Sequence, residues 1–133
     1  MTLRESVAAL KHDLAKYVAW SSANLDEAQW SSPASDELME ALTRDLLSTR
    51  TTRDGRAESA WEVWRRFAPE FAACDYDELE QVAAAVERLE ALEPALRAGD
   101  RKVVGDRCAE VRDAQMSIRK QVRELQRRLA QEN

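Results

Sequence analysis

The fold is decided by the stretch DRKVVGDRCAEVRDAQMSIRKQVRELQRRLAQ, residues 100–131. Apolar and semi-apolar residues recur in it at alternating steps of four and three. They are Val104, Cys108, Val111, Gln115, Ile118, Val122, Leu125 and Leu129. This is the heptad spacing of a helix that buries one seam along its length, and it persists for more than three heptads. We therefore expect one long C-terminal helix, capped by Asp100, with the other helices packed along it.

Two helices are predicted in the N-terminal half of the chain. The first begins with the capping box Thr2-x-x-Glu5, in which each side chain binds a backbone N–H at the other end of the turn. Its apolar stripe has the same alternating spacing and runs through Leu3, Val7, Leu10, Leu14, Tyr17 and Val18. The second helix is expected to begin at Ser32-Pro33, with Ser as the cap and Pro at the first helical position, and to end near Ser48.

Two more helices are predicted before the C-terminal one. An aromatic helix is expected from about Glu58 to Ala68, where Pro69 ends or kinks it. The next helix is expected to be bent by Pro94 and stopped by Gly99. Its cap is predicted to be one of two acidic pairs, Asp75 with Glu78 or Asp77 with Glu80.

Together these elements predict an all-α fold, a single-domain antiparallel bundle of four to five helices over residues 1–133. The first and last helices are expected to pack together, with the aromatic helix closing one end of the bundle.

Composition sets limits on function. The chain of 133 residues carries a net charge of -5, which argues against a nucleic-acid binder. Two cysteines are too few for a disulfide framework, and their spacing does not fit structural zinc. No apolar run is long enough to span a membrane, and the N-terminus does not resemble a signal peptide. We therefore expect a cytoplasmic protein without cofactor, metal or membrane contact.

The chain contains one histidine, His12. At 100° per residue it lies about 180° from the apolar stripe of its helix, so its imidazole is expected to face solvent, with Lys16 one turn further on. Imidazole is a nucleophile, and a nearby cation would steady a phosphoryl group on it. The alternative interpretation is an ordinary exposed histidine.

The string His12-Asp13-Leu14-Ala15-Lys16 resembles the H-box of histidine kinases, in which an acid follows the phosphorylated histidine. It is also similar to the His-x-Leu-Lys pattern of histidine phosphotransfer domains, although the basic residue lies one position later. No Gly-rich ATP lid is present, which excludes a complete kinase. The resemblance implies a phosphotransfer protein that docks the receiver domain of a response regulator.

A second candidate surface combines arginines with aromatic residues. Arg50, Arg53 and Arg56 lie in a predicted turn before Trp61, and Arg65 follows on the aromatic helix. Arginine binds carboxylates in a fork, and both Arg and Trp are enriched at protein interfaces. The hypothesis is a docking patch for an acidic protein. The alternative is that Trp61 and Trp64 belong to the core and the arginines make surface ion pairs.

A third candidate is the C-terminal part of the seam. If it extends beyond the bundle, its apolar residues would pair with a partner helix or with a second copy in a homodimer. They are Ile118, Val122, Leu125 and Leu129. The alternative is that the first helix covers them.

No motif of a small-molecule enzyme is found, so the chain is expected not to be an enzyme. The favoured prediction is a small protein-interaction adaptor in regulation or signalling of the bacterial type, binding an acidic partner through a helical face, an Arg-rich turn, or both. Phosphotransfer through His12 and a coiled-coil oligomer are the alternatives.

Overall fold

The structure is a computed structural model that describes residues 2–18, 35–47 and 59–132, and only the backbone of residues 15–18 and 45. The described ranges are helical and contain no strand, so the all-α prediction is confirmed. The helices are α1 (Leu3–Val18), α2 (Asp36–Leu46), α3 (Ala60–Phe71), α4 (Asp77–Glu90), α5 (Glu93–Ala98), α6 (Arg101–Asp106) and α7 (Cys108–Gln131).

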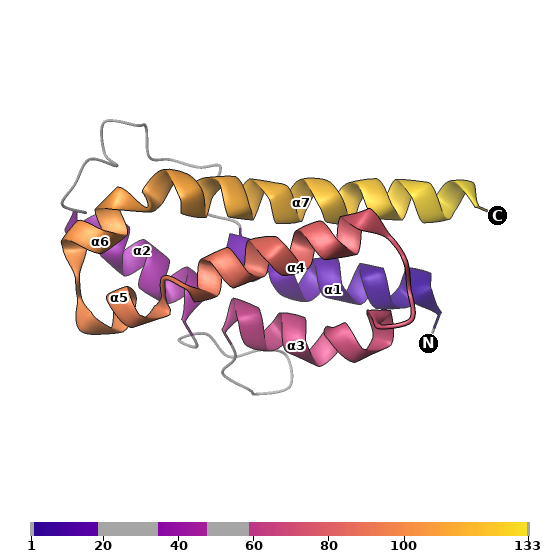
Figure 1. Cartoon of the computed structure of the whole chain (residues 1–133), viewed down its shortest axis with the longest axis horizontal. Coiled ribbons are helices and arrows are strands. Elements are labelled where there is room, and N and C mark those ends of the chain that lie inside the picture. The colour runs from indigo at the N-terminus through magenta and orange to yellow at the C-terminus, as the bar shows by residue number, and fades with distance from the viewer. Residues whose placement is uncertain (1, 19–34, 48–58, 133) are drawn as a thin grey trace.

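α7 is the longest described helix, and it lies against α1 and α4 (Figure 1). Its 24 residues span about 36 Å. Arg4 at the start of α1 donates to the backbone oxygen of Leu129 at the end of α7, with Nη2 at 2.9 Å. Arg128 near the same end binds Glu78 at the start of α4. α1 and α4 therefore both run antiparallel to α7. The contact between α1 and α7 agrees with the prediction that the first and last helices pack together.

α3 completes the bundle on the side away from α7, because it packs on both α1 and α4. Ser6 of α1 donates to Glu70 near the end of α3 at 2.6 Å. Arg65 of α3 forms an ion pair with Glu90 at the end of α4. The prediction that the aromatic helix closes one end of the bundle is wrong: α3 forms one of its four sides.

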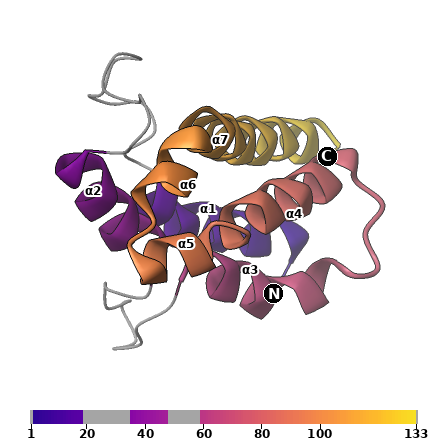
Figure 2. The same ribbon diagram turned by 60° about the vertical axis from the view of Figure 1, so that its left-hand side comes forward.

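The end of the bundle is closed instead by α2, α5 and α6, which lie together in both views (Figures 1 and 2). α2 contacts α1 and α5, and Arg101 of α6 forms an ion pair with Asp36 at the start of α2. Three leucines of α2, Leu38, Leu42 and Leu46, have no exposed surface, so this short helix seals the core at that end.

The predicted C-terminal helix is interrupted at one residue. Asp100 caps α6 through Val103 N–H, and α7 begins after Arg107, whose φ of -104° and ψ of 4° depart from helical values. The N–H of Arg107 points at the carbonyl oxygens of both Val103 and Val104. Val104 and Cys108 on either side are both buried, so the seam continues across the break. Heptad spacing does not reveal this break, because the break leaves the two buried residues one helical turn apart.

Several helix starts confirm or correct the predicted caps. The Thr2 and Glu5 capping box is present. α2 is capped by Ser35, three residues after the predicted Ser32, which lies outside the described residues. A second capping box, between Ser59 and Glu62, begins α3 and was not predicted, although its sequence pattern is the same as that of the first.

The predicted acidic caps of α4 are wrong. Tyr76 occupies the N-cap position without a side-chain hydrogen bond to the helix. Its hydroxyl binds Glu132, and the guanidinium of Arg128 lies over its ring. Glu78 is bound to the same Arg128, so contacts with the end of α7 replace local capping at this helix start.

α3 continues past Pro69 to Phe71. Proline within a helix costs about 3 kcal/mol through the lost hydrogen bond and its clash with the preceding turn. Phe71 is buried, and its ring stacks on Trp64 with 5.9 Å between centroids. Burying such a side chain contributes about 1.5–3 kcal/mol, which offsets most of the cost and extends the helix by two residues.

Candidate functional site

The C-terminal part of the seam is covered within the chain. Ile118, Val122, Leu125 and Leu129 are between 1% and 7% exposed and belong to one hydrophobic cluster with the other helices. These four residues are thus already occupied by the fold and offer no free face to a partner helix. The structure agrees with the alternative interpretation, in which the first helix covers the seam, and α4 covers it as well.

The opposite side of α7 is the exposed one. We call it the outer face of α7 and define it by Glu110, Asp113, Met116, Lys120 and Arg123, all of which are exposed. At 100° per residue they fall within an arc of about 140° whose centre lies opposite the buried seam. Helix α7 therefore separates two functions: one face holds the core together, and the other is available for contact.

Met116 stands out on this face. It is 48% exposed and is the only large hydrophobic side chain among the described residues with such exposure. A single exposed apolar residue is ordinary on a protein surface, but this one lies beside basic residues. Methionine is flexible and adapts to different contact surfaces, which suits a binding position.

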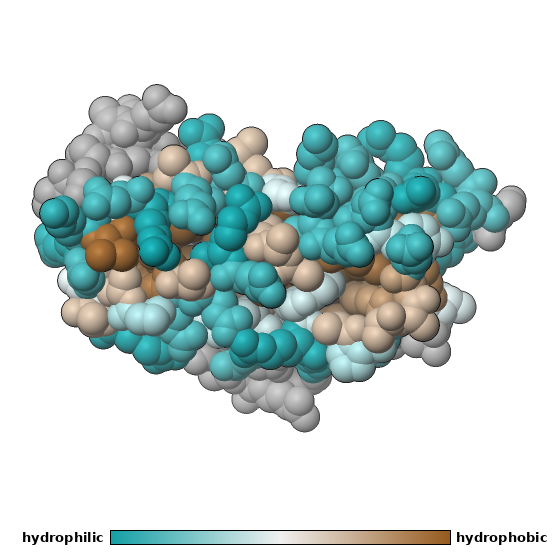
Figure 3. Space-filling model, in the orientation of Figure 1, coloured by the Kyte–Doolittle hydropathy of each residue, from teal (hydrophilic) through white to brown (hydrophobic). Residues whose placement is uncertain are grey.

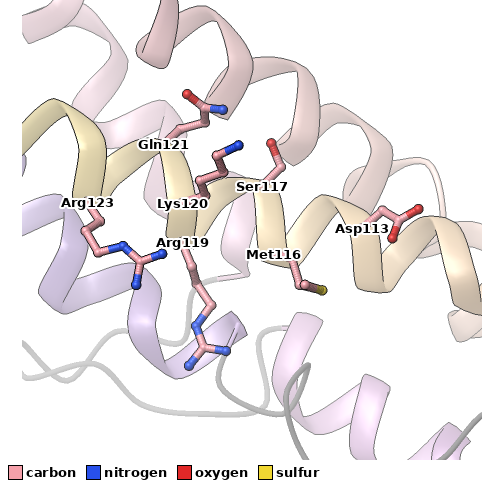
Figure 4. A pocket seen from close by; sticks show the side chains of 7 residues that line it. All are labelled: Asp113, Met116, Ser117, Arg119, Lys120, Gln121 and Arg123. Atoms are coloured by element: carbon pink, nitrogen blue, oxygen red, sulfur yellow. The ribbon is translucent and has the colours of Figure 1, made fainter.

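Met116 lines a shallow surface hollow of about 550 Å³. Met116, Arg119 and Arg123 extend to one side of the helix, while Ser117, Lys120 and Gln121 extend to the other (Figure 4). Asp113 bounds the hollow toward the start of α7. All the lining residues that the structure describes come from α7, so the hollow is a surface between side chains and lies outside the core.

The C-terminal half of α7 is strongly basic in an acidic protein. Residues 119–128 contain five basic side chains and one acidic one, whereas the whole chain has a net charge of -5. The surface over this half is hydrophilic (Figure 3). Arg128 is engaged with Glu78. Within the described part of the chain, the side chains of Lys120 and Arg123 have no hydrogen-bond or ion-pair partner, so their charge is available to another molecule.

The arginine and tryptophan patch is only partly described. Arg50, Arg53 and Arg56 lie outside the described residues. Trp61 is 2% exposed and belongs to the core. Arg65 is an exposed partner of Glu90. For these last two residues the structure matches the alternative of core packing and a surface ion pair.

His12 is exposed, as its position on α1 predicts, with 58% of its side chain accessible. Its Nδ1 lies 3.3 Å from Oδ1 of Asp13. The other oxygen of Asp13 accepts from Nη2 of Arg66 on α3 at 3.0 Å. With the proton on Nδ1, this arrangement leaves the Nε2 lone pair directed away from Asp13. The side chain of Lys16, the predicted neighbouring cation, is not among those described.

The described His, Cys, Asp and Glu side chains include no group of three or more placed to hold a metal ion. A second hollow of about 170 Å³ lies beside Arg4, Gln126 and Leu129, and among the described residues that line it only Arg4 is ionisable. No described helix combines the length and apolarity needed to cross a membrane.

Comparison of the chain with models of known protein families, with curated proteins and with solved structures gives no match. Sequence reasoning gave no role to Glu110, Asp113 and Met116, because charged and single apolar residues opposite a seam have the pattern of an ordinary solvated face.

Proposed function

We propose that the protein is a non-enzymatic interaction module that binds a partner protein through the outer face of α7. The observation that carries this proposal is the exposed Met116 beside Lys120 and Arg123, two cations without partners in the described part of the chain. An apolar centre with charged surroundings is the usual composition of a protein interface. A role as an adaptor in regulation or signalling fits such a module.

The basic half of this face favours a partner whose surface presents carboxylates. Oriented charge at the rim of an interface raises the rate of association and selects against partners of the same sign. The buried seam also favours binding, because it holds α7 rigid along its length. Little conformational entropy is then lost when a partner binds.

A comparative pull-down tests the proposal. The bait is either the wild type or the double variant Lys120→Glu and Arg123→Glu. We expect a specific partner to be lost from the variant, because reversing two exposed charges costs about 1–3 kcal/mol, or about fivefold to 150-fold in affinity. The measurement is quantitative mass spectrometry of the captured proteins.

A matched control separates the outer face from net charge. Arg88→Glu with Lys102→Glu makes the same change in total charge at exposed positions on α4 and α6. The control should keep the partner that the Lys120 and Arg123 variant loses. Equal capture by both variants would exclude the outer face as the docking surface.

A second candidate function, phosphotransfer through His12, is favoured by the Asp13 bridge between His12 and Arg66. Asp13 would fix the imidazole tautomer, and Arg66 would supply a cation close to the acid. Incubation with a small phosphodonor or a phosphorylated receiver domain should then leave acid-labile phosphate on His12. Labelling of a His12→Gln variant to the same extent would remove this candidate.

A further inference from the structure

The charges on the outer face of α7 are divided between its two halves. Glu110 and Asp113 lie before Met116, and Lys120 and Arg123 lie after it. All four are exposed, and none of these side chains has a hydrogen-bond or ion-pair partner in the part of the chain that the structure describes. The face is therefore acidic at one end and basic at the other, with an apolar residue between them.

This division is symmetric about the peptide bond between Met116 and Ser117. Asp113 and Lys120 are equally far from that point, and so are Glu110 and Arg123. When two identical helices lie antiparallel across a two-fold axis, residues equally far from the axis face each other. Each acid of one copy would then meet a base of the other, and every such pair would occur twice.

We infer that α7 pairs antiparallel with α7 of a second copy of this chain, through the outer face and about a two-fold axis near Met116. The inference rests on the proposed function, since it names the partner of the same face. Charge complementarity selects both the occupant and its direction. A parallel pair in register would set like charges opposite each other, which is unfavourable.

The shape of the molecule permits this contact. α7 lies along one side of the bundle with its outer face directed away from α1, α3 and α4 (Figure 1). Met116 from each copy would lie near the axis and lose its 48% exposure there. The buried seam takes no part, so the dimer needs no opening of the bundle. With one apolar residue per copy, the contact depends mainly on charge and weakens as salt screens it.

An acidic segment of another protein is the competing occupant, and Asp113 distinguishes the two. Such a segment would bind only the basic half of the outer face, and its affinity would rise if Asp113 were removed. A second copy needs Asp113 as the partner of Lys120. The two cases therefore predict opposite effects of reversing this one charge.

A charge exchange at these two positions tests the inference by sedimentation equilibrium at low salt. In Asp113→Lys alone, two lysines meet at each pair, and in Lys120→Asp alone, two aspartates meet. We expect each variant to weaken the dimer at least about tenfold. An equimolar mixture of the two variants restores opposite charges at both pairs and should dimerise about as strongly as the wild type. Circular dichroism of each variant establishes that its helices are intact.

The outcomes separate specific pairing from general electrostatics. Asp113→Lys makes the acidic chain less acidic, so relief of net repulsion predicts stronger self-association, whereas the paired arrangement predicts weaker self-association. A wild type that stays monomeric at all concentrations, a single variant that dimerises unchanged, or a mixture that stays monomeric would each overturn the inference.

The same variants keep this inference distinct from the proposed function. If the wild type is monomeric but the pull-down partner depends on Lys120 and Arg123, only the self-pairing is excluded. If the charge exchange behaves as expected and no other protein depends on the face, self-association is its use and binding of another protein is excluded.

Discussion

Cys108 is the residue at which burial acts most directly on side-chain chemistry. It lies in the seam with 1% exposure, and its Sγ donates to the backbone oxygen of Val104 at 3.2 Å. Burial disfavours the thiolate and raises the pKa of this thiol from 9.0 to about 11. Cys74, after the end of α3, is only half-buried. The position of Cys108 in the heptad seam predicted that it would be buried.

The two thiols are expected to react differently. At pH 8 a maleimide or disulfide reagent should modify Cys74 in the folded protein and Cys108 only after denaturant is added, because Cys108 is covered and its thiolate is disfavoured. The measurement is mass spectrometry of the labelled peptides over time. Equal labelling of both cysteines without denaturant would contradict the buried seam.

The raised pKa of Cys108 also sets a pH dependence. The unfolded chain releases this proton near pH 9, whereas the folded chain holds it until about pH 11. The contribution of this thiol to stability is therefore complete below pH 9 and is lost as the pH rises toward 11. Urea unfolding measures the free energy of unfolding across this pH range, which should decline less for Cys108→Ala than for the wild type. An identical decline in both would count against the raised pKa of Cys108.

Gly99 is the other residue whose role is set locally. It has φ of 67° and ends α5, as its position before Asp100 predicts. Gly99→Ala should lower the free energy of unfolding by about 1–2 kcal/mol, because a side chain in the left-handed conformation meets the following carbonyl. Gly99→Asn should lose less, since asparagine tolerates this conformation. Urea unfolding measures both, and an alanine variant as stable as the wild type would exclude the strained conformation.

At the scale of the element, α7 combines a seam that could be predicted with a break that could not. Ile118 and Leu125 are buried as the heptad spacing predicts. The interruption at Arg107 has no apolar signature, because it leaves the seam register unchanged. The predicted caps show a similar limit: Tyr76 begins α4 through contacts with Arg128 and Glu132, which are distant in sequence. Local patterns therefore predict elements and faces better than ends that distant contacts decide.

The two faces of α7 should respond differently to truncation. Leu125→Ala leaves a cavity in the core and should lower the free energy of unfolding by about 2–5 kcal/mol. Arg123→Ala on the outer face should change it by no more than about 0.5 kcal/mol. Urea unfolding of both variants provides the comparison. Similar losses would mean that the outer face also supports the fold.

At the scale of the whole molecule, the sequence predicted an antiparallel helical bundle with the first and last helices packed together, but it placed the aromatic helix at one end and not along a side. Several helices have an apolar stripe of suitable spacing, and the pattern does not state which stripe meets which. The structure selects α1, α3, α4 and α7 as the sides and places the shorter helices at one end. Phe67 and Phe71 of α3 are 6% and 5% exposed, so this helix contributes to the core as one of the sides.

The candidate site shows the same limit. From the sequence, the candidates were the apolar residues of the seam and several arginines. The seam residues are buried in the core, and the partners of the arginines can be identified only in the folded chain. The charged residues of the outer face have the pattern of a solvated surface. They became a candidate once Glu110, Asp113, Lys120 and Arg123 were found exposed and without partners in the described part of the chain.

The most direct test of this account is cross-linking at position 116. In a Cys74→Ala background, Met116→Cys is treated with a short bismaleimide at low salt, with Ala84→Cys, an exposed position on α4, as the control. Paired outer faces bring the two copies of residue 116 within reach, because packed helices lie about 8–10 Å apart. We predict rapid formation of a covalent dimer at position 116 that is lost when Asp113→Lys is added. Cross-linking no faster than at position 84 would contradict the pairing of α7 with a second copy.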